Sequence, residues 1–126
     1  MNTDEDVLAI CMSEFDDAAD ALNEAIDDAI SAILALNIRV SVAINIDRDR
    51  AICFDKKNKE WSVRLFTIGQ GETELSSASL QDRLNAAKAF PLLIEAMRTA
   101  YQANLIEMKL VTASTKIFTD ALRKGS

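Results

Sequence analysis

The sequence predicts an α+β fold. We expect a long N-terminal helix, a three-stranded antiparallel meander, and long C-terminal helices, kinked at a proline, that pack on the sheet and the first helix. Three observations predict it: apolar residues recur every three or four positions over residues 7–36, they alternate with polar residues in three stretches between 38 and 68, and helical spacing returns from residue 80. With 49% hydrophobic residues, the 126-residue chain has enough apolar material for a single domain, residues 1–126.

Residues 7–36 are predicted to form one amphipathic helix. Acids at positions 4–6 suit the positive end of its dipole, and Asn37 is the predicted stop. The apolar residues of this helix keep steps of three and four, which places them on one side. They are Leu8, Cys11, Phe15, Ala18, Leu22, Ala25, Ala29, Ile33 and Leu36, widened by Ile26 and Ile30.

Residues 38–46 alternate strictly between apolar and polar side chains, which is the pattern of an antiparallel strand with one buried face. Residues 51–55 and 61–68 are the next two predicted strands, and short polar turns join the three. Such turns are too short for parallel crossovers, so the strands are predicted to form a meander. A Gly-Gln-Gly turn then ends the sheet, and residues 72–79 follow as a polar loop.

A further helix is predicted from Leu80, capped by Ser79 with Asp82 as the third residue after it. Pro91 has no amide hydrogen, so we expect either a kink or a new helix with Pro91 in its first turn. Helical spacing continues through the rest of the chain. A break is expected within 112–115, because a β-branched, hydroxyl-rich run is a weak helix former.

The aromatic residues and methionines are predicted to be core rather than ligand contacts. Phe54, Trp61 and Phe66 lie in apolar alternation, whereas a sheet that binds single-stranded nucleic acid exposes its aromatics for base stacking. The predicted core or dimer-interface residues of the last helix are Met97, Tyr101 and Met108.

Helix length predicts self-association. Two helices of about 30 residues would each extend roughly 45 Å, which exceeds the span of a sheet with such short strands. Apolar surface beyond the sheet needs a further layer, and a second copy of the chain supplies one. We therefore expect a homodimer with helix–helix contacts.

Charge divides the chain into two unequal parts. The first 37 residues carry ten carboxylates and no Lys or Arg, and the remainder carries ten acids and all fourteen basic residues. Such a division favours charge-based binding. The net charge of −6 argues against direct binding to nucleic acid or to an anionic membrane, because both require positive charge.

The candidate partner-binding residues are carboxylates opposite the apolar side of the first helix. They span roughly 21 Å, about one charge per 3 Å, close to the ~3.4 Å spacing of phosphates along one DNA strand. One interpretation is a phosphate-like surface for a basic nucleic-acid-binding protein. The other is a solvated face, partly neutralised by the basic turns of the sheet. The seven residues are Glu14, Asp16, Asp17, Asp20, Glu24, Asp27 and Asp28.

Metal and enzyme chemistry have little support in the sequence. Glu14 with Asp17, and Glu24 with Asp27, form carboxylate pairs one turn apart that suit Mg²⁺ or Mn²⁺, which leaves a nucleotide hydrolase as an alternative. Related hydrolases place such pairs on two facing helices, and here both lie on one. The absence of histidine excludes Ser-His-Asp triads and His-containing zinc sites. We predict no catalytic residues, no metal site and no cofactor.

The two cysteines and the start of the chain predict a cytoplasmic protein. Cys11 and Cys53 lie in apolar patterns and are read as small buried hydrophobes in a reducing compartment. The first residues are acidic where a signal peptide has basic ones. The host cytoplasm is the expected compartment if a mobile element encodes the chain.

A pattern covering about a third of the chain, from Lys56 to Met97, combines a charged turn, a strand, a polar loop and a helical stretch. Its strand is Trp61-Ser62-Val63-Arg64-Leu65, and its helical part contains Ser79-Leu80, Arg83, Ala86-Ala87 and Ala89-Phe90-Pro91-Leu92-Leu93. This pattern resembles small uncharacterised accessory proteins of phages and other mobile elements. The resemblance rests on hydrophobic patterning and transfers no catalytic residue. It implies an accessory role, often inhibition of host defence by occlusion of nucleic-acid sites.

The leading hypothesis is therefore a non-enzymatic, acidic, dimeric binding protein that inhibits a basic partner, such as a nuclease or a CRISPR-type effector. A secretion or assembly chaperone is an alternative, because such chaperones are also small, acidic, dimeric and α+β. They place further strands after the second helix, and this chain shows mostly helix there.

Overall fold

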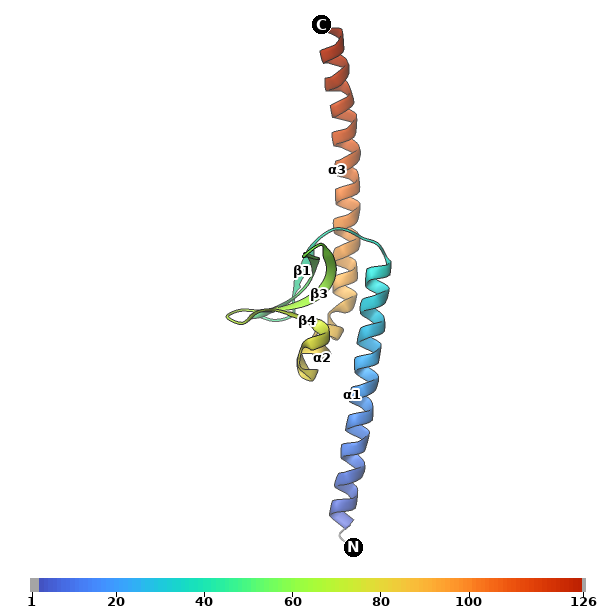
Figure 1. Cartoon of the computed structure of the whole chain (residues 1–126), viewed down its shortest axis with the longest axis vertical. Coiled ribbons are helices and arrows are strands. Elements are labelled where there is room, and N and C mark those ends of the chain that lie inside the picture. The colour runs from blue at the N-terminus through green and yellow to red at the C-terminus, as the bar shows by residue number, and fades with distance from the viewer. Residues whose placement is uncertain (1–2, 126) are drawn as a thin grey trace.

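The computed structural model describes residues 3–125, with side chains from Asp4 onward, and confirms the α+β layout with long N- and C-terminal helices (Figure 1). A four-stranded antiparallel sheet lies between the helices in sequence, where three strands were predicted. The elements in chain order are α1 (Thr3–Ala35), β1 (Val42–Asn45), β2 (Arg50–Lys57), β3 (Glu60–Thr67), β4 (Gly71–Glu74), the 3-10 turn η1 (Leu75–Ser77), α2 (Leu80–Lys88) and α3 (Phe90–Lys124).

The sheet has the order β1-β2-β3-β4, so each strand pairs with its neighbour in sequence. The first strand is shorter than the predicted 38–46, because only Val42–Asn45 pairs with β2. The predicted loop 72–79 is wrong over its first half. Glycines with positive φ at 69 and 71 close a hairpin, and Gly71–Glu74 pairs with β3 as an edge strand.

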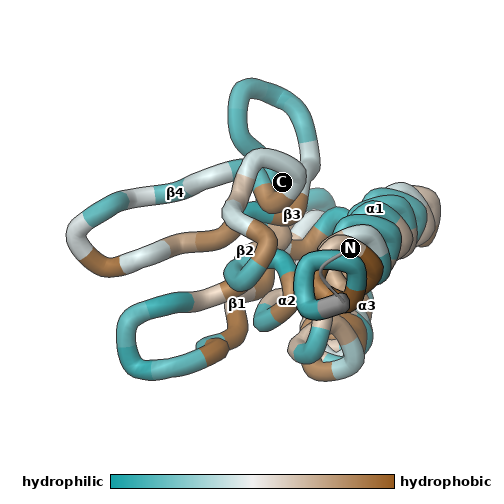
Figure 2. The backbone as a smooth tube through the Cα atoms, turned by 90° about the horizontal axis from the view of Figure 1, so that it is seen from below, coloured by the Kyte–Doolittle hydropathy of each residue, from teal (hydrophilic) through white to brown (hydrophobic). Residues whose placement is uncertain are grey.

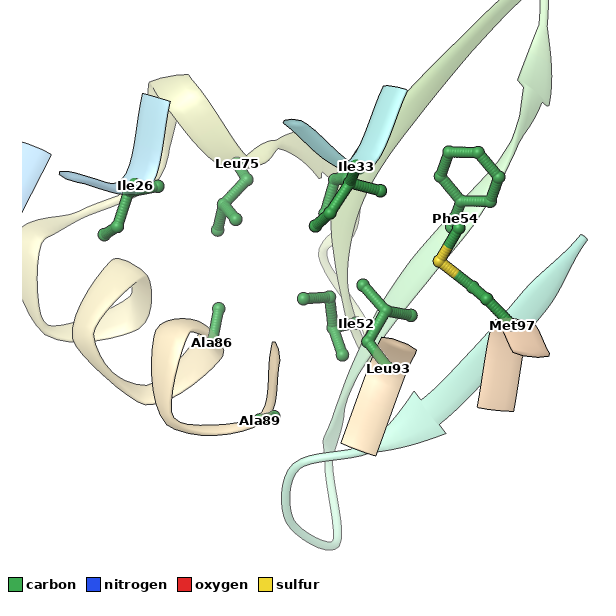
Figure 3. Packing of buried hydrophobic residues seen from close by; sticks show 10 residues of the cluster. Ile26, Ile33, Ile52, Phe54, Leu75, Ala86, Ala89, Leu93 and Met97 are labelled. Atoms are coloured by element: carbon green, nitrogen blue, oxygen red, sulfur yellow. The ribbon is translucent and has the colours of Figure 1, made fainter. Parts of the chain in front are cut away.

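One face of the sheet carries the core. Ile52 and Phe54 of β2 are fully buried there, and Val63 of β3 lies opposite Phe54. α3 packs against β1 and α1 packs against β3, so the two long helices cover the same face (Figures 1 and 2). Figure 3 shows Ile26 and Ile33 of α1 and Leu93 and Met97 of α3 reaching this core. The phenyl ring of Phe54 stacks on Trp61 with ring centroids 5.1 Å apart.

The helical boundaries follow local chemistry. The Ser79 hydroxyl accepts a hydrogen bond from the Asp82 amide at 3.2 Å, which confirms the predicted cap of α2. The helix changes direction at Ala89, and α3 starts with Pro91 in its first turn, so the new-helix alternative is confirmed. The expected break within 112–115 is wrong, because α3 continues to Lys124. Hydroxyls of the run donate to carbonyls of the preceding turn, as Thr112 does to Met108 O at 2.7 Å, and the helix is kept.

Both long helices extend beyond the core in opposite directions (Figure 1). We call residues 3–20 of α1 the N-terminal arm and residues 101–124 of α3 the C-terminal arm. Figure 2, seen along the helices, shows that α1 and α3 run along the same side of the sheet. Large apolar side chains on both arms are exposed, so the chain itself does not cover them. They are Val7, Leu8, Ile10, Met12 and Phe15 on the first arm, and Tyr101, Ile106, Met108, Leu110, Val111, Ile117, Phe118 and Leu122 on the second.

Replacing Lys59 by glycine is expected to stabilise the fold. Asn58 and Lys59 form the two-residue turn between β2 and β3, and their φ angles are 54° and 69°. Such a turn needs positive φ at both positions, which glycine adopts freely and lysine does not. We expect Lys59→Gly to raise the free energy of unfolding by about 0.5–1 kcal/mol, measured by urea denaturation. Lys57→Gly, in the strand just before the turn, is the control and should lower it.

Candidate partner-binding face of the first helix

The seven predicted carboxylates all lie on α1 and all are exposed. At 100° per residue, Asp17, Glu24 and Asp28 fall opposite Leu8, Phe15 and Ile26, so one helix separates a charged side from an apolar side. We call the seven residues together the acidic face. The face starts on the N-terminal arm and ends beside the core, because Asp27 follows the buried Ile26.

Within residues 3–125 no ion pair involves a residue of the acidic face. The basic turns of the sheet pair elsewhere: Arg50 with Asp47 and Asp82, and Lys57 with Glu72. Within residues 3–125 the basic turns therefore form no ion pair with the acidic face, and the interpretation of that face as a solvated surface stays untested. Repulsion between like charges one turn apart costs an isolated helix a few tenths of a kcal/mol for each pair, and no close cation offsets it among the described residues.

An apolar hollow of about 410 Å³ lies on the other, apolar side of the same helix, between α1 and the start of α2. Phe15 at its edge is 62% exposed. Every residue that α1 contributes to the hollow belongs to the predicted apolar side or neighbours it. The lining residues are Phe15, Ala18, Ala19, Leu22, Leu80, Gln81 and Leu84.

A second charged cluster, which the sequence reading missed, lies on the uncovered face of the sheet. Arg64 of β3 is only 4% exposed and pairs with Asp55 of β2. It also pairs with β4, with Nε 3.3 Å from Glu72 Oε2 and Nη1 3.7 Å from Glu74 Oε1, and it donates to the Ser62 hydroxyl at 2.6 Å. The available signal was Glu-Thr-Glu after a glycine turn, which puts two carboxylates on one side of a strand facing Arg64.

Titration is perturbed at two places away from the acidic face. Hydrogen bonds from the Arg50 side chain hold the pKa of the Asp47 carboxyl below its ordinary value, aided by the Asp49 amide. Burial raises the pKa of the Cys53 thiol, and the nearby Glu72 carboxylate acts in the same direction. Both groups belong to structural contacts of the sheet and its turns. Neither adjoins the hollow or the acidic face.

Several smaller predictions are corrected. Phe66 is 39% exposed rather than core, because it alternates onto the uncovered side of the sheet, whereas Phe54 is buried as predicted. Cys11 is exposed and Cys53 is half-buried, so the reading of both as buried is wrong. Met97 is confirmed as core, and Met108 is 51% exposed on the C-terminal arm.

The carboxylate pairs do not form a metal cage in the part of the chain that the structure describes. No group of three or more His, Cys, Asp or Glu side chains there is arranged to hold an ion. Glu107, an acid of the second long helix, lies on the C-terminal arm, which points away from α1 (Figure 1). Separately, none of the helices described over residues 3–125 combines the length and apolar character that crossing a bilayer requires.

Comparisons with known proteins add no relative. No protein-family model, no curated protein and no solved structure matches the chain. The acidic face and its surroundings are therefore the features from which a function is inferred.

Proposed function

We propose that this chain is a non-enzymatic binding protein that presents the acidic face of α1 to a basic protein surface. The partner class is a nucleic-acid-binding protein, such as a nuclease or a CRISPR-type effector, and the expected effect is inhibition by occlusion of its nucleic-acid site. This is the accessory, anti-defence role that the resemblance to mobile-element proteins implied.

The single observation that carries the proposal is a row of exposed carboxylates without a counter-ion. Seven acids lie on one side of a rigid helix, and the described chain supplies no cation to any of them. Their density along the helix axis, about one charge per 3 Å, is close to the spacing of phosphates along a nucleic-acid strand. Arg- and Lys-lined grooves that bind phosphates would attract such a rod.

Neutralising the acidic face is expected to abolish partner binding without loss of the fold. The variant combines Asp16→Asn, Asp20→Asn, Glu24→Gln and Asp27→Asn. It removes repulsion within the helix, so the free energy of unfolding should stay equal or rise slightly. Binding is measured by pull-down from candidate host cells, followed by calorimetry with the purified partner at low and high salt, where wild-type affinity should fall steeply as salt rises.

A matched control neutralises four carboxylates that lie off α1 and should leave binding unchanged: Asp49, Glu60, Glu107 and Asp120. Sedimentation of every variant shows whether self-association has changed as well. Binding that is indifferent to both salt and the α1 substitutions would remove the proposal.

A secretion or assembly chaperone is the second candidate. The exposed apolar sides of both arms favour it, since a client segment could lie along them. Against it, no strand follows α2 within residues 3–125, where such chaperones place further strands. Binding that requires an unfolded client peptide, and that persists in the neutralised variant, would favour this candidate over the first.

A further inference from the structure

The two arms leave more surface exposed than a compact monomer does. The chain exposes 9055 Å². A compact monomer of its mass, 13.9 kDa, exposes about 6,700 Å². The excess is about 2,400 Å² for each chain, and covering it in a pair of chains would give an interface of the size found in obligate homodimers.

Part of the exposed apolar surface of each arm continues the side that forms the core, although Ile106, Leu110 and Ile117 of the C-terminal arm fall on the opposite side of α3. On α1, Leu8 and Phe15 lie in line with Ile26 and Ile33, whose side chains are buried. On α3, Met108 lies in line with Met97, which is buried. Each arm therefore carries an apolar side that faces the same way as the core but extends beyond it. Each arm thus presents an apolar helix side with no helix packed against it in the described chain.

Charge selects which arm can pair with which. The N-terminal arm has seven carboxylates and no cation, so two such arms would repel each other. The C-terminal arm has four cations and two carboxylates. Opposite net charges favour contact between an N-terminal arm and a C-terminal arm. Within one chain the arms point in opposite directions and do not meet, so the complementary arm must come from another copy (Figure 1).

We propose that a second copy of this chain covers both arms by exchange. In a two-fold dimer whose axis is perpendicular to the long helices, each N-terminal arm runs antiparallel along the C-terminal arm of the partner. The arms have similar lengths, roughly 27 Å and 36 Å at 1.5 Å per residue. The self-complementary contact occurs twice, as two-fold symmetry requires.

The flanking charges agree with the antiparallel direction. Lys109, Lys116 and Arg123 recur at seven-residue steps and follow one edge of the apolar side of the C-terminal arm. Glu5 and Asp16 lie at the corresponding edge of the N-terminal arm, reached by turning about the helix axis in the same direction from its apolar side. When two helices pack antiparallel, their corresponding edges lie opposite each other. These acids and cations therefore meet across the proposed contact between the arms. Asp17 and Glu24 lie on the far side and stay available to an external partner, so this inference does not rest on the proposed function.

Charge reversal on full-length chains tests the exchange. One variant carries Lys109→Glu with Lys116→Glu, and a second carries Glu5→Lys with Asp16→Lys. Each alone should weaken self-association at least about tenfold in sedimentation equilibrium, because like charges then line both contacts between the arms. An equimolar mixture should restore a complex of twice the chain mass, because each arm of one variant meets an arm of opposite charge from the other.

A control with the same charge change on the outward side, Asp6→Lys with Asp17→Lys, should leave the dimer intact. To locate the contact, a photoreactive benzoylphenylalanine replaces Asp16, and isotope-labelled mixtures identify cross-links between copies. Cross-links from position 16 to residues 101–124 of another copy support the exchange. This holds also if the chains form an assembly larger than a dimer. A wild-type chain that stays monomeric at about 100 µM, cross-links to another N-terminal arm, or a mixture that fails to re-associate would each overturn it.

Discussion

Replacing Phe54 by alanine is expected to cost about 3–5 kcal/mol of the free energy of unfolding, which is a large part of the 5–15 kcal/mol typical of a domain. Phe54 has no exposed surface, stacks on Trp61 at 5.1 Å between centroids, and belongs to the same buried cluster as Met97 of α3 (Figure 3). Truncation removes the ring contacts and leaves a cavity that a β-sheet closed by two long helices cannot collapse readily. Urea denaturation followed by circular dichroism measures the loss.

Phe66→Ala is the matched control, because the same side chain lies on the adjacent strand of the same sheet but on its uncovered face. With 39% of its surface exposed, Phe66 should cost about 1 kcal/mol or less. Equal losses for the two phenylalanines would show that the core does not lie on the helix-covered face and would contradict the described packing.

Replacing Arg64 by methionine is expected to cost about 3 kcal/mol. The side chain is 5% exposed, and it separates the carboxylates of Asp55, Glu72 and Glu74 across three strands. Methionine keeps the length of the side chain but removes the cation, so three negative charges are left facing one another around a buried apolar group. Breaking a buried pair from one side costs about 3–5 kcal/mol, and the partial exposure of the acids places this case at the lower end.

The control for this variant is Arg98→Met. Arg98 pairs with Glu95 at 3.2 Å on the solvent side of α3, with both side chains at least 60% exposed, so its loss should cost less than about 0.5 kcal/mol. Thermal unfolding of the two variants side by side measures the difference. A loss at Arg64 no larger than at Arg98 would mean that water, rather than Arg64, compensates the acids of β4.

The sequence predicts the long elements well, because burial on one side imposes a strict period. α1 and the paired parts of β2 and β3 follow from spacing alone. β4 could not be found that way, because all four of its residues are exposed and no apolar alternation marks it. Its position is defined by backbone pairing with β3, where Glu74 lies opposite Arg64, which is a tertiary contact rather than a local pattern. For the same reason Phe66 was placed in the core, since a local pattern does not say which face of the sheet the helices cover.

The acidic face was predictable as a surface but its surroundings were not. The period of α1 already places the seven carboxylates opposite Leu8 and Phe15. The period does not show that the cations at Arg50 and Lys57 pair within the sheet and its neighbours, or that Leu80 and Leu84 of α2 complete an apolar hollow beside Phe15. Those facts depend on the turn directions and on the change of direction at Ala89, which are tertiary features.

The opposite directions of the two arms also govern how the molecule diffuses. A chain much longer than it is wide experiences more friction than a sphere of equal mass, so it leaves a gel-filtration column early even when it is alone (Figure 1). Retention volume calibrated on spherical standards would then report a pair of chains where only one exists. Light scattering and sedimentation equilibrium measure molar mass independently of molecular shape. They are therefore the methods suited to determining how many chains associate.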